Sequence, residues 1–372
     1  MRTDVTNRLR QQLDRAGLDA LVCMSPENIA YTAGFVIPSQ SLMRWRHAMT
    51  LITADGREAI VCIDMEETTV RASSGETEVR VWREFIDRPM EVFVALLRDW
   101  GLASARVAIE MNYLPAADYE TLRAALPDLD LCAGDDILVA ARQVKSADEL
   151  LLLERLARIS DTAIRTAYES AAVGTSEMDI AAALTRSVYE QGAQQFKLMI
   201  VASGERSQLP NVGPTGRRLA PGDVCRVEIF SVIDGYHAGV CRTAVVGDAP
   251  PIAERIYANL VECKHAVFDA IRPGASSRHV YETYQKTFNA LKMPAISFVA
   301  HSIGVNLHEP PYFGPYSHHV VQEGMVLGME PLVYRTGHGF GMQIKDMIAV
   351  GASGARLLSD VTDTEKMFQI PA

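Results

Sequence analysis

The chain has 372 residues, a formal net charge of −10 and 48% hydrophobic residues, a composition ordinary for a globular protein of one or two domains. Negative charge without a Lys/Arg block argues against a nucleic-acid surface. No apolar run is long enough for a membrane span or a signal peptide, so we expect neither. The six cysteines are scattered without a CxxC pair, which predicts a reduced, cytoplasmic protein without disulfides.

Residues 1–140 alternate helix and strand patterns, which predicts a small α/β domain. ALVCMS, MTLITADG, EAIVCI and RVAIE are expected strands, and MEVFVALLRDWG is an expected helix that ends at glycine. Ser146 and Glu149 then form a capping box at the start of a long apolar-periodic helix. We therefore place a domain boundary here, with residues 141–372 as the second domain.

The second domain mixes helices and strands, so the fold class predicted for the whole chain is α/β (α+β). Helices are expected up to about residue 190 and again at 251–293. The expected strands lie at 197–203, 222–247, 296–303 and 324–350.

An Asp-Gly pair at 234–235, between two β-rich runs, predicts a two-residue hairpin turn. Counting outward from that turn pairs Phe230 with Gly239 and Glu228 with Cys241, all on one face of the sheet. Glycine weakens a strand interior, so Gly239 marks a close approach or a missing group.

The acid and the thiol on this face have two interpretations. They are a functional pair, or they are a half-exposed pair in which Glu228 binds Arg226. The hairpin geometry alone favours the second interpretation.

Three further stretches carry titratable groups. AHSIGVNLHEPP holds His301 and His308 around a glycine, and EGMVLGMEPLVY places Glu330 in a strand. GMQIKDMIAVG is a strand pattern with Gln343 and Lys345 on one face. Each stretch alone is a weak signal, because a single strand His or Glu is usually solvated or bonded in the core.

The order and spacing of six blocks resemble the pita-bread family of methionine aminopeptidase, aminopeptidase P, prolidase and creatinase. The blocks are VASGERSQLPN, PGDVCRVEIF, DGYHAGVCRT, HSIGVNLHEPP, GMVLGMEP and QIKDMIAV. The resemblance implies a pita-bread fold for the second domain. For the first, it implies the smaller N-terminal domain of the prolidase and creatinase branch.

The metallopeptidases of that family hold two metal ions with two Asp, one His and two Glu. The resemblance places these positions at Glu228, Gly239, His301, Glu330 and Lys345. Two ligands are therefore replaced, and Lys345 supplies a positive charge of its own. This implies a site without metal or other cofactor, as in the creatinase branch. A single residual ion on Glu228, His301 and Glu330 is the alternative.

Three departures argue against creatine as the substrate. The resemblance places Asn211, Cys241 and Tyr312 where creatinase has a catalytic His, a Glu and a carboxylate-binding Arg. Asn211, Tyr312 and Gln343 are then candidate substrate-binding residues.

The remaining groups have open roles. His301 and His308 can carry protons near neutral pH. Cys241 is an activated thiolate or an inert strand residue. Glu330 acts as a base or holds a substrate cation. Lys345 anchors a substrate carboxylate or stabilises an oxyanion, or else forms an ion pair that replaces the metal.

Arg44 and Arg46 flank a tryptophan in PSQSLMRWRHAM. The resemblance to creatinase implies a homodimer in which Arg46 reaches the partner's active site, where arginine suits a carboxylate. The alternative is an ion pair within the dimer interface.

Together these patterns predict a metal-independent hydrolase of an amide or amidine C–N bond in a small, carboxylate-bearing molecule. Its predicted catalytic residues are His301, His308, Glu330, Cys241 and Glu228. Three alternatives stay open: a catalytically silent binding module, a metal-dependent Xaa-Pro dipeptidase-like peptidase, and a lyase. Retention of both histidines and Glu330 favours an enzyme.

Overall fold

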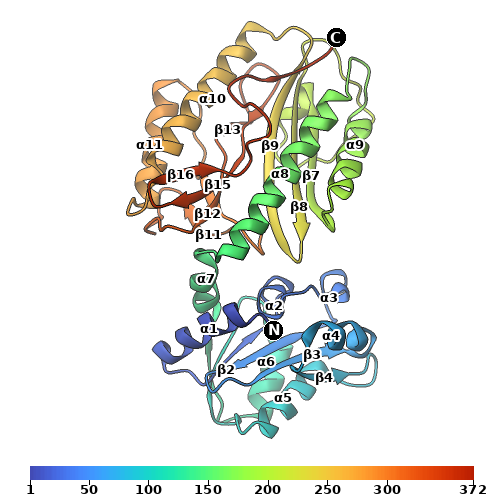
Figure 1. Cartoon of the computed structure of the whole chain (residues 1–372), viewed down its shortest axis with the longest axis vertical. Helices are drawn as coiled ribbons and strands as arrows, with labels where there is room; N and C mark the ends of the chain where they lie inside the picture. Colours follow the sequence, from blue (N-terminus) through green and yellow to red (C-terminus); the bar gives the residue numbers. More distant parts are fainter. The chain divides into compact units, whose positions relative to one another are not determined.

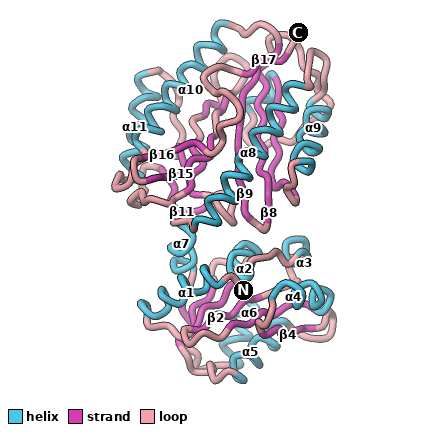
Figure 2. The backbone as a smooth tube through the Cα atoms, in the orientation of Figure 1, coloured by secondary structure: helices cyan, strands magenta, loops and turns pink.

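The computed structural model describes residues 1–372 and contains no helix with the length and apolar character needed to cross a membrane. The chain divides into two compact units, Met1–Arg142 and Gln143–Ala372 (Figure 1). Helices and strands are mixed in both units, so the predicted α/β (α+β) class is confirmed (Figure 2).

The first unit is built on a six-stranded sheet with the order β4-β3-β2-β1-β5-β6. Neighbouring strands are antiparallel at β1–β2 and β2–β3 and parallel elsewhere. Its strands are β1 Ala20–Cys23, β2 Met49–Thr53, β3 Glu58–Ile63, β4 Glu78–Trp82, β5 Arg106–Ile109 and β6 Asp130–Ala133. Its helices are α1 Thr3–Ala16, α2 Pro26–Ala33, α3 Pro38–Leu42, η1 Asp64–Glu66, α4 Glu67–Ser74, α5 Pro89–Asp99, α6 Ala116–Ala125 and α7 Asp135–Gln143.

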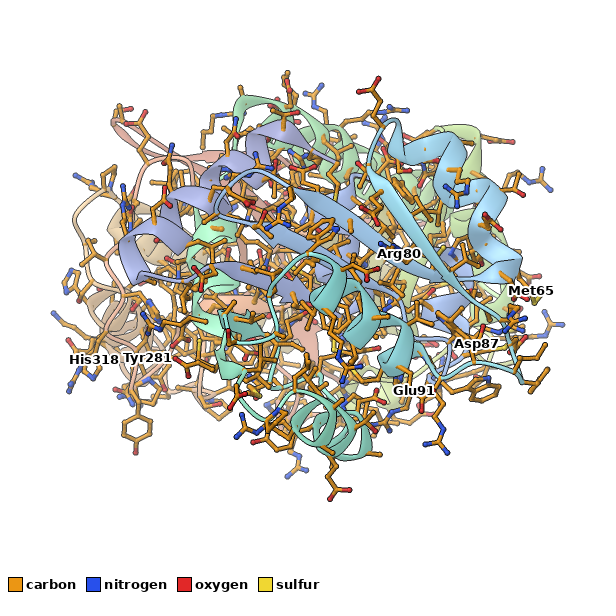
Figure 3. All side chains as sticks on the ribbon, turned by 90° about the horizontal axis from the view of Figure 1, so that it is seen from below. Met65, Arg80, Asp87, Glu91, Tyr281 and His318 are labelled. Atoms are coloured by element: carbon orange, nitrogen blue, oxygen red, sulfur yellow. The ribbon has the colours of Figure 1, made fainter.

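The four predicted strands of this unit are confirmed as β1, β2, β3 and β5, and the predicted helix as α5. The pattern missed β4 because charged residues alternate with its apolar ones. Arg80 on β4, labelled in Figure 3, forms ion pairs with Glu78 at 2.6 Å and with Asp99 at 2.9 Å.

The second unit carries two larger sheets, with strand orders β17-β9-β8-β7 and β11-β10-β12-β15-β16. Its strands are β7 Gln195–Ser203, β8 Val224–Ile233, β9 Tyr236–Val246, β10 Ala300–Ser302, β11 Glu309–Phe313, β12 Val326–Met329, β13 Leu332–Val333, β14 Met342–Gln343, β15 Asp346–Gly351, β16 Gly354–Leu357 and β17 Phe368–Ile370. Its helices are α8 Ala147–Glu169, α9 Glu177–Glu190, η2 Gly204–Gln208, α10 Pro251–Ala270 and α11 Ser277–Ala290. In Figure 1, the pair α8 and α9 and the pair α10 and α11 flank the strands on opposite sides.

The predicted hairpin is confirmed residue by residue. Asp234 and Gly235 have positive φ angles of 50° and 80°, as a tight two-residue turn between strands requires. Glu228 pairs with Cys241, and Phe230 pairs with the glycine at 239. The predicted capping box also forms at the start of α8.

Candidate active site

The site lies where β8, β9, β10, β12 and β14 meet inside the second unit. A backbone bridge between Cys241 and Lys345 joins the two sheets at this point, with N–O distances of 3.2 Å and 3.1 Å. The predicted residues that the structure brings together are Glu228, Cys241, His301, His308, Glu330, Gln343 and Lys345.

Lys345 is the centre of this cluster. Its ammonium lies 3.2 Å from Glu228 Oε1 and 3.2 Å from Glu330 Oε2, and 4.6 Å from the ring centre of Phe230. Burial alone would lower the pKa of Lys345, but the two carboxylates outweigh it and raise the pKa above its usual value. Because the side chain is fully buried, the structure supports the ion pair and not the predicted anchor for a substrate carboxylate.

The two oxygens of Glu330 have different surroundings. Oε2 accepts a hydrogen bond from the Gln343 side chain at 3.0 Å and also faces the Lys345 ammonium. Oε1 is buried without a hydrogen-bond partner and lies 3.4 Å from His301 Nε2. Burial raises the pKa of Glu330, but Lys345 and His301 overcome that effect and lower it to about 2. Glu330 is therefore a carboxylate near neutral pH.

His301 and His308 stack face to face, with ring centres 3.6 Å apart. His301 Nδ1 lies 2.8 Å from the backbone oxygen of Ser302, and an oxygen there can only accept, so Nδ1 carries the proton. Burial, His301 and Lys345 lower the pKa of His308 to about 3. This direction disfavours a protonated His308 near neutral pH, and its role in proton transfer stays a prediction.

Gly328 provides the space for this arrangement. A Cβ atom at this position of β12 would lie 3.1 Å from His301 Nε2 and 3.2 Å from Lys345 Cε, closer than side chains normally pack. The glycine in the GMVLGMEP block therefore permits His301 and Lys345 to approach each other.

The surroundings of Cys241 disfavour an ionised thiol. Its side chain is fully buried, and burial together with the neighbouring Glu228 carboxylate raises the pKa of the thiol well above its usual value. A thiol is a nucleophile only when it is ionised. The structure therefore favours the alternative of an inert strand residue, and a catalytic role for Cys241 stays a prediction.

The position of Gly239 is closed by a neighbouring ring. A Cβ atom there would clash with the side chain of Phe230, its partner across the hairpin. The Phe230 ring fills the space that an aspartate side chain at position 239 would need. This is a physical reason why the position holds a glycine and no metal ligand.

Gly239→Ala is expected to destabilise the protein by about 1–3 kcal/mol, because an added methyl group overpacks this buried strand. Chemical denaturation measures the change. The same substitution in a Phe230→Leu background should cost less, since the ring that it meets is gone. Equal costs in both backgrounds would show that Phe230 is not the obstacle.

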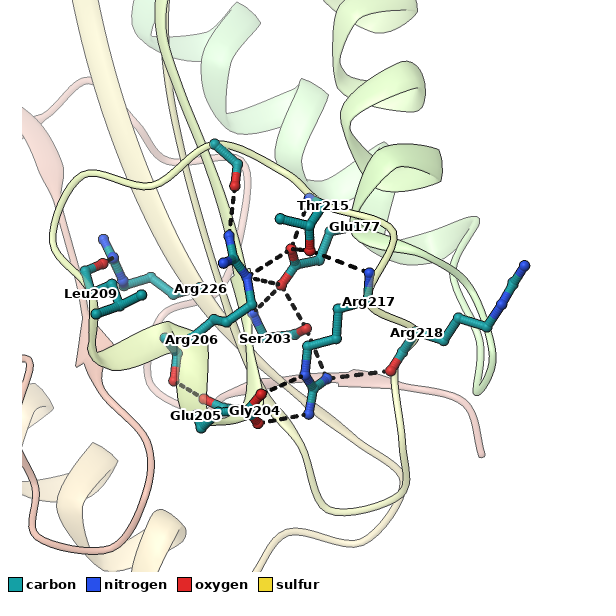
Figure 4. Close-up of polar contacts among 12 residues, drawn as sticks. Glu177, Ser203, Gly204, Glu205, Arg206, Leu209, Thr215, Arg217, Arg218 and Arg226 are labelled. Atoms are coloured by element: carbon teal, nitrogen blue, oxygen red, sulfur yellow. Dashed lines mark hydrogen bonds and ion pairs between the residues drawn. The ribbon is translucent and has the colours of Figure 1, made fainter.

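The loop that carries Asn211 is anchored by a buried carboxylate. Glu177 accepts hydrogen bonds from the backbone and hydroxyl groups of Ser203 and Thr215 at 2.7–2.9 Å, and Arg206 Nε lies 3.1 Å away (Figure 4). Within that anchored loop Asn211 is exposed, and no contact joins it to the cluster. Its predicted substrate-binding role stays a prediction.

Three other predicted site residues, Tyr312, Arg44 and Arg46, form none of the hydrogen bonds or ion pairs of the cluster. Tyr312 is 44% exposed, and its hydroxyl lies 3.4 Å from the backbone oxygen of His308. In the first unit, Arg46 forms two hydrogen bonds of 2.9 Å with Glu84, while Arg44 is exposed. The homodimer and the reach of Arg46 into a partner's site stay predictions.

A cavity of about 830 Å³ is lined by residues from 205–210, 294–296 and 334–337, and no residue of the cluster lines it. Its wall combines apolar side chains, such as Leu209 and Pro210, with the acidic Glu205 and the basic Arg206 and Arg335. The buried Arg226 links the cavity wall to the cluster. Its Nη2 donates to the backbone oxygens of Leu209 and Pro210, its Nη1 donates to Gln343, and its guanidinium lies 5.0 Å from the Tyr334 ring centre.

Sequence reasoning missed Tyr334 and Arg335 as cavity residues. The available signal was the position of these two residues just after the GMVLGMEP block. Nothing in the local pattern shows that the turn after β13 and the loop at 209–210 line the same cavity.

Two family models match the chain. The model described as metallopeptidase family M24 matches residues 152–352, and the creatinase/prolidase N-terminal domain matches residues 6–144. The chain belongs to metallopeptidase family M24. This confirms the predicted family and fold, a pita-bread domain preceded by a creatinase/prolidase-type domain.

Several M24 relatives are dipeptidases by name. The Xaa-Pro dipeptidase of Pyrococcus furiosus is 28% identical over 235 residues, which span 62% of this chain and 66% of that protein. The putative dipeptidase YkvY of Bacillus subtilis is 25% identical over 364 residues, 95% of this chain and 96% of that protein.

Solved structures agree in fold. The crystal structure of dipeptidase PepE from Mycobacterium ulcerans has a TM-score of 0.84 and 25% identity, covering 99% of this chain and 98% of that one. The prolidase from Pyrococcus horikoshii OT3 has a TM-score of 0.83 and 23% identity, covering 97% and 99%.

These findings correct the predicted function. The metal-independent, creatinase-like hydrolase of a non-peptide C–N bond is wrong, because the family is one of metallopeptidases and the relatives are named as dipeptidases. The broader prediction of a hydrolase is supported. The alternative of a metal-dependent Xaa-Pro dipeptidase-like peptidase fits the relatives better.

The residues present do not fit the pair of ions that the M24 resemblance implies. Phe230 closes the position at Gly239, so no second aspartate is available. The Lys345 ammonium lies between Glu228 and Glu330, where it would repel a second cation. No step of the reaction is therefore derived through a metal pair.

Proposed function

We propose that this chain is an Xaa-Pro dipeptidase-type hydrolase that cleaves the peptide bond of a small substrate. The observation that carries the proposal is the convergence of His301, His308 and Glu330, in a cluster that Arg226 connects through Gln343 to the wall of a cavity of about 830 Å³. Family membership and the names of the relatives support the same reaction class.

The cavity has the chemistry for a short peptide that contains proline. Leu209, Pro210 and Ile296 give it an apolar wall, which suits a pyrrolidine ring. Arg335 adds an exposed cation, which suits the terminal carboxylate of a dipeptide. The apolar wall orients the substrate, and the cation fixes its end.

The two carboxylates of the cluster, Glu228 and Glu330, are held by Lys345, and Glu228 is the proposed proton acceptor. Lys345 holds Glu228 and Glu330 in place through two contacts of 3.2 Å. Glu228 Oε2 lies 4.0 Å from Arg226 Nη1, and as a carboxylate oxygen it can accept the proton of an attacking water.

A panel of dipeptides tests the proposal. The purified protein, supplied with zinc, cobalt or manganese, is expected to release amino acids from Xaa-Pro dipeptides and to act poorly on matched Xaa-Ala dipeptides. Glu330→Gln is expected to abolish release. A folded protein that cleaves no dipeptide under any of these conditions would contradict the proposal.

The Lys345 bridge favours a second candidate, a catalytically silent peptide-binding protein of the same fold. An internal cation between two carboxylates satisfies them without any metal or substrate. Binding of an Xaa-Pro dipeptide by calorimetry, without hydrolysis over long incubation, is the result that would support this candidate.

A further inference from the structure

We propose that Arg226 is a positioning residue for the reaction. Through Gln343 it holds the Glu330 carboxylate in one orientation, and with the same guanidinium it fixes the wall of the cavity. Arg226 is fully buried and does not line the cavity, so it acts through its neighbours. The inference rests on the proposed function, because it assigns the cavity to the substrate and the cluster to the reaction.

The orientation of the Gln343 amide is decided by its two partners. Arg226 Nη1 lies 3.0 Å from Gln343 Oε1, and a guanidinium can only donate hydrogen bonds. The amide oxygen therefore faces Arg226, and the amide NH₂ group donates to Glu330 Oε2 at 3.0 Å. With the amide turned round, two donors would meet at Arg226 and two acceptors at Glu330. Arg226 thereby determines that Gln343 presents a donor to Glu330.

This hydrogen bond matters because the two oxygens of Glu330 have unequal partners. Oε2 accepts from Gln343 and faces the Lys345 ammonium at 3.2 Å. Oε1 is buried without a hydrogen-bond partner and lies 3.4 Å from His301 Nε2. A carboxylate group turns as a unit, so a fixed Oε2 also keeps Oε1 directed toward His301. Lys345 alone is a compact point charge, which attracts a carboxylate without fixing its plane.

The second arm of the guanidinium holds the cavity wall. Arg226 Nη2 donates to the backbone oxygens of Leu209 at 2.6 Å and Pro210 at 3.0 Å (Figure 4). Both residues line the cavity, as does Tyr334, whose ring centre lies 5.0 Å from the guanidinium carbon. Because a guanidinium is planar and rigid, its two arms keep the wall and Gln343 at a fixed spacing.

The free-energy cost of this arrangement indicates a role beyond stability. The side chain of Arg226 is 0% exposed, and its hydrogen bonds go to neutral oxygen atoms. Glu228 Oε2 lies 4.0 Å from Nη1, beyond hydrogen-bond distance, and Nε is buried without a partner. A buried charge that is paired so incompletely costs free energy that a hydrophobic side chain would not. Natural proteins accept such costs at functional sites.

Two substitutions separate the two arms. Gln343→Met removes the link to Glu330 and leaves Arg226 bound to the wall. Its kcat on an Xaa-Pro dipeptide should fall about tenfold, as expected for one lost hydrogen bond, while KM changes little. Arg226→Met removes both arms. Its kcat should fall by the same factor, and its KM should also rise about tenfold because the wall is released.

The double variant tests whether Arg226 acts through Gln343. Arg226→Met should cause no further loss of kcat in the Gln343→Met background, because the link is already broken. Losses of kcat that multiply would overturn the inference. Arg226→Lys keeps the charge but cannot hold two partners in a fixed geometry, and it replaces Arg226→Met in the cycle if that variant does not fold. Arg158→Met, which breaks an exposed ion pair with Asp360, should match the natural protein.

Crystal structures of the natural protein and of Arg226→Met, or of Arg226→Lys in its place, test the positioning without any activity. We expect the contact between Gln343 and Glu330 to be lost and Glu330 Oε1 to move away from His301. A Glu330 carboxylate that keeps its position would overturn the inference. Failure here is distinct from failure of the proposed function. Hydrolysis with kcat unchanged in both single variants would refute the positioning role alone, and a displaced Glu330 in a protein that cleaves no dipeptide would refute the dipeptidase alone.

Discussion

Replacing Glu228 by glutamine is expected to lower kcat on an Xaa-Pro dipeptide by about 10²–10⁴-fold, the usual loss for a general base. Glu228 is buried on β8, where Lys345 holds it at 3.2 Å. An amide of the same shape cannot accept a proton. Since binding of the substrate does not need that proton, KM should change little.

Two measurements separate this role from its alternatives. Steady-state kinetics give kcat and KM, and denaturation shows whether the change weakens the fold. Glu228→Asp keeps the charge opposite Lys345 and the ability to accept a proton, so it should retain more activity. An unchanged kcat in Glu228→Gln would exclude Glu228 from the reaction.

Local patterns predicted the features of the fold that depend on neighbours in the sequence. The Asp-Gly turn at 234–235 set the register of the hairpin, and period-two alternation then placed Glu228 opposite Cys241, as the structure has it. The capping box at Ser146 likewise specified where α8 begins. In each case, the residues that decide the structure lie within a few positions of one another.

The site was harder to predict because its contacts join distant parts of the chain. Lys345 contacts Glu228 across 117 positions, and no local pattern shows that its ammonium lies between two carboxylates. No local pattern showed that the His308 ring stacks on His301, seven positions earlier. Burial also decided the chemistry of Cys241, and a strand pattern alone does not give the pKa of a thiol.

Arg242→Met is expected to destabilise the protein by about 3–5 kcal/mol at pH 7, because it leaves buried carboxylates without a positively charged partner. The guanidinium is 2% exposed and lies 3.0 Å from Asp161 and 2.9 Å from Asp346, both almost fully buried. It also donates to the backbone oxygen of Lys345 at 2.9 Å, so it supports the bridge between sheets that positions that ammonium. Chemical denaturation of both proteins measures the difference in unfolding free energy.

The pH dependence of the unfolding free energy distinguishes an unpaired buried charge from a loss of packing. In the natural protein, burial would raise the pKa of Asp161, but Arg242 outweighs it and lowers the pKa below 3.8. That stabilisation is present above the unfolded pKa and is lost as the pH falls through the folded one. Without Arg242, burial raises the pKa of Asp161 in the folded protein. The free-energy cost of burying its charge is therefore complete at neutral pH and disappears as the carboxyl group is protonated. The difference in unfolding free energy between the two proteins should therefore shrink on acidification.

Arg356→Met is the matched control. It breaks an exposed ion pair with Glu154 and should cost about 0–1 kcal/mol. A difference for Arg242→Met that is independent of pH would assign its cost to packing alone.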